Sequence, residues 1–195
     1  QQAVVTAMDA SGDLYGSDRT EAWMKPVHDA VTAMGAGTTG RGRLADLVAD
    51  TSAEAIALAS RLAPVYSPAL PTPSDLVRDL TLAARLINAN LELRVITVAH
   101  GGFDLHDGHS WGYPNLLGPL DDGIEAFFTT LSSKYRSRVA LMTFSEFGRT
   151  VRANGSGGTD HGTAAPHLVI GAGVKGGLYG AQPRLDDLTS RGDLK

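Results

Sequence analysis

The pattern of apolar and polar positions changes character near residue 92. Before this point, apolar residues recur at the three- and four-residue spacing that places them on one face of a helix. The sequence therefore predicts an N-terminal half made of helices and loops. The segments that carry such a stripe are residues 20–34, 43–50, 51–62 and 72–91.

Residues that favour helix starts and breaks help to place these elements. Thr51, with Glu54 three residues later, matches the capping box that opens many helices. Thr72 is expected to be the N-cap of the fourth helix, with Pro73 at the first helical position. Residues 64–74 hold four prolines and are predicted to form an extended loop.

After residue 92, short apolar and β-branched runs alternate with a helical pattern. Such runs are typical of buried strands in parallel sheets, and a strand–helix–strand order with a long crossover implies that the strands are parallel. The expected fold class is α/β, with a parallel-sheet segment over residues 93–195 that belongs to one domain with the helical half. The predicted strands are 93–99, 138–144 and 167–171, and the predicted helix is 115–135.

Composition narrows the classes of function. Net charge is −4 and no basic run occurs, which argues against a nucleic-acid partner. The absence of cysteine excludes thiolate metal sites and a cysteine nucleophile. No apolar run has the length of a membrane-spanning helix, so no membrane span is predicted.

The first polar cluster follows the predicted strand 93–99. In "HGGFDLHDGH", Asp104, His106, Asp107 and His109 offer carboxylate and imidazole ligands that suit zinc, manganese or iron. The spacing does not choose between His106 and His109. Because ligands bind at the carboxyl ends of parallel strands, this loop is expected at the functional edge of the sheet.

The second cluster, "SEFGRT", follows the predicted strand 138–144. Glu146 could be a metal ligand, an acceptor behind a ligand or a general base. Arg149 could bind an oxyanion through two parallel hydrogen bonds. The alternative is an ion pair between Arg149 and Glu146 that only shapes the loop.

The third cluster, "GTDHGTAAPH", lies before the predicted strand 167–171. Asp160 and His161 are adjacent, so both can face one ion only at a turn, which the flanking glycines permit. His167 begins the strand and could point back to the same site. Five of the six histidines fall between residues 100 and 167, and this concentration predicts a divalent metal site.

Four motifs, "GGFDLH", "SEFGRT", "NGSGGTDHG" and "GAGVKGGLYG", occur in this order. Through them, residues 75–195 resemble the bacterial domain-of-unknown-function family fifteen-oh-one, which is placed in the alkaline-phosphatase-like, or sulfatase-like, superfamily. The resemblance implies an α/β sandwich around a mostly parallel sheet. It also implies a centre of divalent metals, often two, that hydrolyses small anionic phosphate or sulfate esters, and an exported or periplasmic protein.

The resemblance also assigns roles to individual residues. Asp104 with His106 or His109, together with His167, matches one metal position, and Asp160 with His161 matches the second. Zinc is the expected metal, with manganese, calcium or magnesium as alternatives. Arg149 or Lys175 would hold the anionic group, with Arg149 and Glu146 as the candidate catalytic residues.

The superfamily also has an Asp and a Ser or Thr nucleophile upstream of the first cluster, and residues 1–92 show no match to them. The chain is therefore expected to be an internal segment of a longer protein. Two alternatives remain open. One is an exported binding or structural protein that keeps the fold, and a metal with it, without turnover. The other is an iron oxygenase with a His/His/carboxylate site.

Overall fold

The computed structural model describes residues 26, 29–30, 33, 42–71 and 73–194. The chain forms two compact units, Gln1–Arg94 and Val95–Lys195. Most of the helix predicted over residues 20–34 lies outside the described residues. Among the described residues, no helix is both long enough and apolar enough to cross a membrane.

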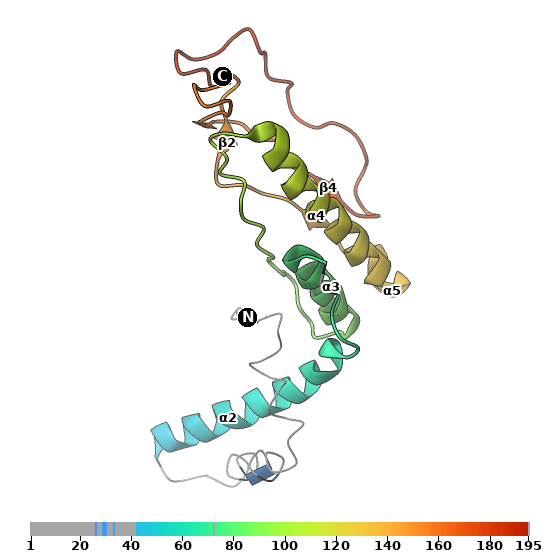
Figure 1. Ribbon diagram of the computed structural model, residues 1–195. Coiled ribbons are helices and arrows are strands. Elements are labelled where there is room, and N and C mark those ends of the chain that lie inside the picture. Colours follow the sequence, from blue (N-terminus) through green and yellow to red (C-terminus); the bar gives the residue numbers. More distant parts are fainter. Residues whose placement is uncertain (1–25, 27–28, 31–32, 34–41, 72, 195) are drawn as a thin grey trace. The chain divides into compact units, whose positions relative to one another are not determined.

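The described residues of the first unit are mostly helical (Figure 1). Helix α2 spans Arg43–Leu62 without a break, so the expectation of two helices with Thr51 as a cap is wrong. Neither Gly nor Pro interrupts residues 43–62, and extending an existing helix costs less free energy than starting a second one. The short 3-10 helix η2, Ala63–Tyr66, follows and contacts both α2 and α3.

Helix α3, Asp75–Asn88, has the amphipathic character that the sequence predicts. Its N-cap is Ser74, whose Oγ accepts a hydrogen bond from the backbone N–H of Val77 at 3.2 Å. The helix therefore begins after Ser74 and not at Pro73, while Thr72 lies outside the described residues. Four residues of the predicted stripe are buried, namely Leu76, Leu80, Ala83 and Ala84.

The loop before α3 is tied to it by one side chain. Arg85 donates hydrogen bonds to the carbonyl oxygens of Val65 and Ala69 at 3.1 and 3.3 Å, and also to that of Pro68. The Ser67–Pro68 peptide bond is cis. The predicted loop over residues 64–74 is thus confirmed after its first turn, which belongs to η2.

The second unit contains helix α4, His109–Thr130, helix α5, Ser133–Arg136, and long connections with short strands (Figure 1). Helix α4 begins six residues earlier than the predicted start at residue 115. The predicted helix over residues 115–135 already contains Pro119, and α4 contains Pro114 as well, although proline disfavours a helix interior. Its N-cap is Gly108, with a φ of 56° that glycine adopts readily.

Two small sheets are present among the described residues, and both are antiparallel. Strand β1, Leu141–Met142, pairs with β4, Val169–Ile170, and these strands lie within the predicted segments 138–144 and 167–171. Strand β2, Gly148–Arg149, pairs with β3, His161–Gly162. Residues 93–99, expected to be a strand, have irregular backbone. The parallel sheet therefore stays a prediction.

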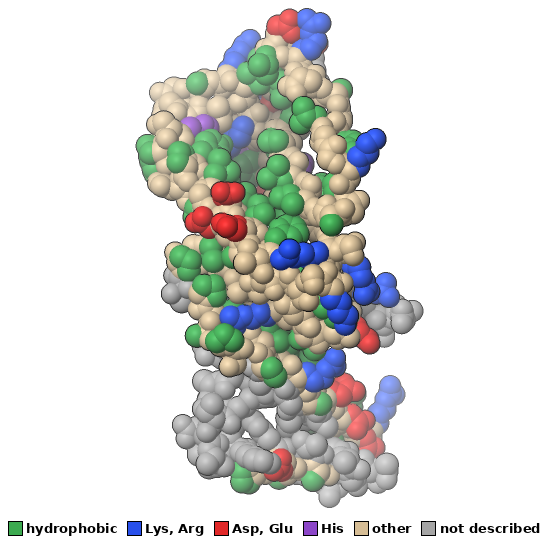
Figure 2. All heavy atoms as spheres, turned by 90° about the vertical axis from the view of Figure 1, so that its right-hand side faces the viewer, with side chains coloured by type: hydrophobic (Ala, Val, Ile, Leu, Met, Phe, Trp, Pro, Cys, Tyr) green, Lys and Arg blue, Asp and Glu red, His purple; other side chains and the backbone are tan. Residues whose placement is uncertain are grey.

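Apolar side chains of the second unit are exposed where the sequence predicts a buried sheet. Met142 and Val169 face each other across β1 and β4 and are 62% and 49% exposed. Phe144, two residues further along, is 72% exposed. Figure 2 shows hydrophobic side chains gathered over the upper part of one face. A two-stranded sheet leaves such a face open, whereas a larger sheet covered by helices would bury it.

Candidate metal centre

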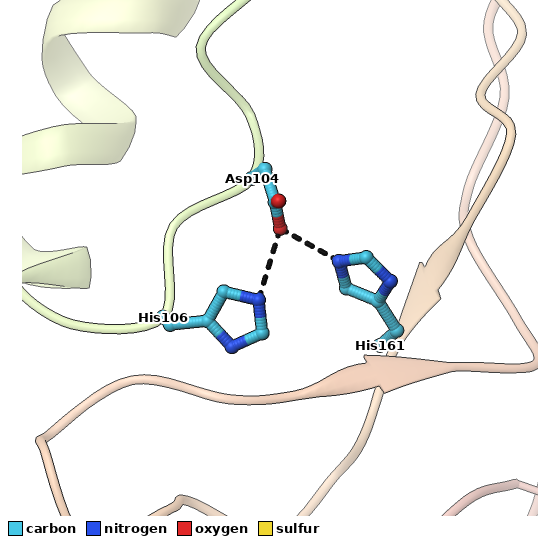
Figure 3. A group of neighbouring side chains, drawn as sticks. All are labelled: Asp104, His106 and His161. Atoms are coloured by element: carbon cyan, nitrogen blue, oxygen red, sulfur yellow. Dashed lines mark hydrogen bonds and ion pairs between the residues drawn. The ribbon is translucent and has the colours of Figure 1, made fainter.

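Two segments far apart in the sequence form the site. Asp104 and His106 lie on the loop that leads into α4, and His161 lies on strand β3 (Figure 3). Strand β3 pairs with β2 so that His161 is opposite Arg149. A bridge between Asp107 and Gly157 joins the loop to the β2–β3 connection. Backbone pairing thus brings the first and third sequence clusters together.

Asp104 is the centre of the cluster. Its Oδ1 lies 3.1 Å from Nε2 of His106 and 2.6 Å from Nε2 of His161 (Figure 3). One ligand atom from each of the three residues lies within 4.8 Å of the other two. The side chains are 60%, 50% and 48% exposed, so solvent reaches the cluster. The three residues can therefore converge on one ion that remains open to water or substrate.

The donor set fits a divalent transition metal. Two imidazole nitrogens and one carboxylate oxygen are ligands that zinc accepts, and catalytic zinc sites combine three protein ligands with one open position. The same set is found at iron sites that react with oxygen. The structure thus supports a candidate metal triad of Asp104, His106 and His161, without fixing which metal it holds.

Asp160 lies behind His106 and not beside Asp104. Its Oδ1 is 3.1 Å from Nδ1 of His106, whereas Nε2 on the other side of that ring faces Asp104. A carboxylate on the far nitrogen of a metal-binding histidine orients the ring and raises its basicity. The sequence predicts Asp160 and His161 as a ligand pair, and the structure places only His161 within the triad.

An aromatic side chain orients His161. The Phe147 ring stacks on the His161 imidazole with centroids 4.3 Å apart and planes 2° from parallel. The guanidinium carbon of Arg149 lies 4.9 Å from the centroid of the Phe147 ring. The stacked ring restricts rotation of the imidazole and so fixes the direction of Nε2 toward Asp104.

Arg149 connects the two segments of the site. Its guanidinium donates hydrogen bonds to the carbonyl oxygens of Phe103 and Thr159, at 2.6 and 2.9 Å, and to Oδ1 of Asp104 at 3.2 Å. The side chain is only 16% exposed, and its Nε is buried without a hydrogen-bond partner. Arg149 and Glu146 are both described by the structure and form no ion pair with each other. The alternative interpretation, in which such a pair shapes the loop, is therefore wrong.

The polar contacts keep both carboxylates ionised. The hydrogen bond with His161 is the main cause that lowers the pKa of Asp104, aided by the positive potential of His106 and Arg149. The hydrogen bond from Asn154 is the main cause that lowers the pKa of Asp160, followed by the one with His106. Ionised carboxylates are the forms that bind a cation or orient an imidazole.

The remaining candidate residues of the second unit are not part of the triad. His109 opens α4, where its Nε2 lies 2.8 Å from the carbonyl oxygen of Leu105 and its ring packs against Tyr113. The structure thus favours His106 over His109. His167 is exposed and lies two residues before β4, and Glu146 is exposed before β2. Neither belongs to the triad.

Two residues that hold the site were not predicted from the sequence, namely Phe147 and Asn154. Phe147 lies between Glu146 and Arg149 in "SEFGRT", and the chemistry predicted for this motif rests on those two charged residues. Asn154 opens "NGSGG", a run whose turn-forming residues are typical of loops. Phe147 directly precedes strand β2 and lies two positions before Arg149, a spacing at which side chains on extended backbone share one face, and this spacing is the signal in the sequence for their contact.

Comparison with known proteins identifies a family. The model of the family "Protein of unknown function (DUF1501)" matches residues 17–191, and the chain belongs to this family. No curated protein and no solved structure matches the chain.

Proposed function

We propose that this member of the family is a metal-dependent hydrolase of small phosphate or sulfate esters. The observation that carries the proposal is the convergence of Asp104, His106 and His161, with one ligand atom from each within 4.8 Å of the others. A bound divalent ion would polarise the ester and lower the pKa of a bound water. Zinc is the proposed metal because it accepts two imidazole nitrogens and one carboxylate oxygen, and manganese, calcium or magnesium are the alternatives.

The side chains around the triad would supply orientation and charge. Asp160 holds the ring of His106, and Phe147 holds that of His161. Arg149 adds a fixed positive charge beside Asp104, which would favour an anionic ester over a neutral one. Glu146, which is exposed and directly precedes Phe147, is the proposed general base. We also propose that the complete domain has the alkaline-phosphatase-like fold.

The test is metal analysis combined with hydrolysis assays on the purified protein. We expect a divalent metal in about stoichiometric amount, turnover of p-nitrophenyl phosphate or sulfate, and loss of both after chelation. The matched variants are Asp104→Asn and Asp186→Asn. The first removes a ligand, whereas the second removes an exposed carboxylate that pairs with Arg184. A protein that takes up no metal would overturn the proposal.

Two other results point to alternative functions. Bound metal without turnover of any ester favours an exported binding or structural protein that keeps the site. Two histidines and one carboxylate are also the ligand set of non-haem iron oxygenases, and the observed triad has this composition. Bound iron together with oxygen consumption would therefore favour an oxygenase.

A further inference from the structure

Asn154 joins the two segments of the site through its side-chain amide. Its Nδ2 donates a hydrogen bond to the carbonyl oxygen of His106 at 2.8 Å. The same nitrogen lies 3.2 Å from Oδ1 of Asp160, which accepts a second hydrogen bond. These contacts span 48 and 6 positions of the sequence, so one amide links the loop before α4 to the β2–β3 connection.

The contacts of Asn154 and Asp160 hold His106 at two points. Asp160 Oδ1, which accepts from Asn154, also lies 3.1 Å from Nδ1 of the His106 imidazole. His106 is thus held at its backbone oxygen by Asn154 directly and at its ring by Asp160, which Asn154 holds in turn. With the backbone and Nδ1 both fixed, Nε2 is directed toward Asp104, 3.1 Å away.

The amide itself has no freedom to turn. Its Oδ1 accepts hydrogen bonds from the backbone N–H groups of Ser156 and Gly158 at 2.9 and 3.1 Å. The backbone N–H of Asn154 donates to the carbonyl oxygen of Gly158 at 2.9 Å. Both donors and both acceptor positions of the side chain are therefore used, which is the full capacity of an amide. A flipped amide would place an NH₂ group against two N–H donors.

Close backbone approach supports the same contact. A Cβ on Gly158 would collide with the backbone of His106 and lie 2.7 Å from the backbone nitrogen of Asp107. The Asp107–Gly157 bridge lies beside it. The β2–β3 connection therefore packs closely against the loop that carries Asp104 and His106, and the side chain of Asn154 forms hydrogen bonds with both segments.

We propose that Asn154 is a positioning residue for the metal triad. It fixes the direction of the His106 imidazole through its hydrogen bond to the carbonyl oxygen of His106 and through Asp160, which contacts Nδ1 of that imidazole. The inference rests on the proposed function only in taking His106 as a metal ligand. Loss of a partner behind a metal ligand costs about 10- to 100-fold in metal affinity. Asn154 should have an effect of this size although it does not touch the metal.

The test compares Asn154→Asp with Asn115→Asp, an exposed position of α4. Both changes add one negative charge. Asn154→Asp keeps an oxygen that accepts from Ser156 and Gly158, but it replaces the donor that faces Asp160 and His106. We expect Zn²⁺ affinity, measured by calorimetry, to fall about 10- to 100-fold in Asn154→Asp and to stay unchanged in Asn115→Asp. The visible spectrum of bound Co²⁺ should also change in the first variant only.

A purely structural role would lower stability without changing the Co²⁺ spectrum or the affinity of the folded protein, and that result would overturn the inference. A second readout needs no metal. In long-range ¹H–¹⁵N spectra of the metal-free protein, the resonances of the His106 ring should shift in Asn154→Asp and not in Asn115→Asp, because the contact between Nδ1 and Asp160 depends on Asn154. A wild-type protein that binds no metal would overturn the proposed function. Identical His106 ring spectra of the wild type and Asn154→Asp would overturn the role of Asn154, whether or not metal binds.

Discussion

Oδ1 of Asp104 lies 2.6 Å from Nε2 of His161, although the two residues are separated by 57 positions in the sequence. Arg149 lies 3.2 Å from the same oxygen and His106 lies 3.1 Å from it. One carboxylate oxygen therefore gathers three nitrogen-bearing side chains from two segments.

Asp104→Asn should weaken metal binding more than any change behind the ligands. The amide keeps the shape of the carboxylate but loses the charge that attracts the cation. We expect affinity for Zn²⁺ to fall by more than about 100-fold, beyond the usual effect of losing a partner of a ligand. Calorimetric titration measures the loss, and Asp186→Asn is the matched control. Equal affinity in the two variants would exclude Asp104 as a ligand.

Phe147→Leu should loosen the His161 ring while keeping an apolar side chain. Aromatic stacking contributes about 0.5–1.5 kcal/mol beyond buried area, so we expect Zn²⁺ affinity to fall roughly 2- to 10-fold. The control is Phe144→Leu, which changes a phenylalanine that is 72% exposed. An equal loss in both variants would show that the stacked geometry has no part in binding.

Gly158→Ala should destabilise the protein because a Cβ at this position collides with the backbone of His106. Overpacking of this kind costs about 1–3 kcal/mol in the free energy of unfolding. The control is Gly155→Ala, where no atom lies within 4 Å of the added Cβ. Urea unfolding of the metal-free proteins separates the two, and a stable Gly158→Ala variant would contradict the close approach.

Stability should decline on acidification because the folded protein lowers the pKa of Asp104 and Asp160 below the ordinary value of 3.8. A lowered pKa stabilises the fold at pH values above 3.8, and this contribution is lost as the pH falls through the lowered pKa. Asp160→Asn should therefore be less stable than the wild type at neutral pH, and the difference should disappear in acid. Unfolding curves measured across this range test the expectation, and a difference that does not depend on pH would contradict it.

The sequence by itself determined the local features. The stripe of α3 follows from spacing alone, since helical periodicity brings Leu76, Leu80 and Ala83 to one face whatever surrounds it. The sequence motifs also indicated the family, which the comparison confirmed. Asp104, His106 and His161 were among the predicted ligands because carboxylates and imidazoles gather in glycine-rich loops.

Several element boundaries were beyond what a local pattern specifies. The sequence predicted a helix from residue 115, but α4 begins at His109. This candidate histidine therefore lies in the first turn of the helix. Strands β2 and β3 are two residues long, which is too short for an alternating pattern to be recognised.

Only the tertiary structure decided which predicted ligands converge. The choice between His106 and His109, and the position of Asp160 behind His106, depend on how the loop before α4 lies against the β2–β3 connection. The contacts of Asn154 and Phe147 with the site also join segments that are distant in the sequence. Asn154 contacts His106 through its side-chain amide, and Phe147 stacks on the ring of His161. Such contacts join residues across the fold, whereas sequence periodicity reports only neighbours along the chain.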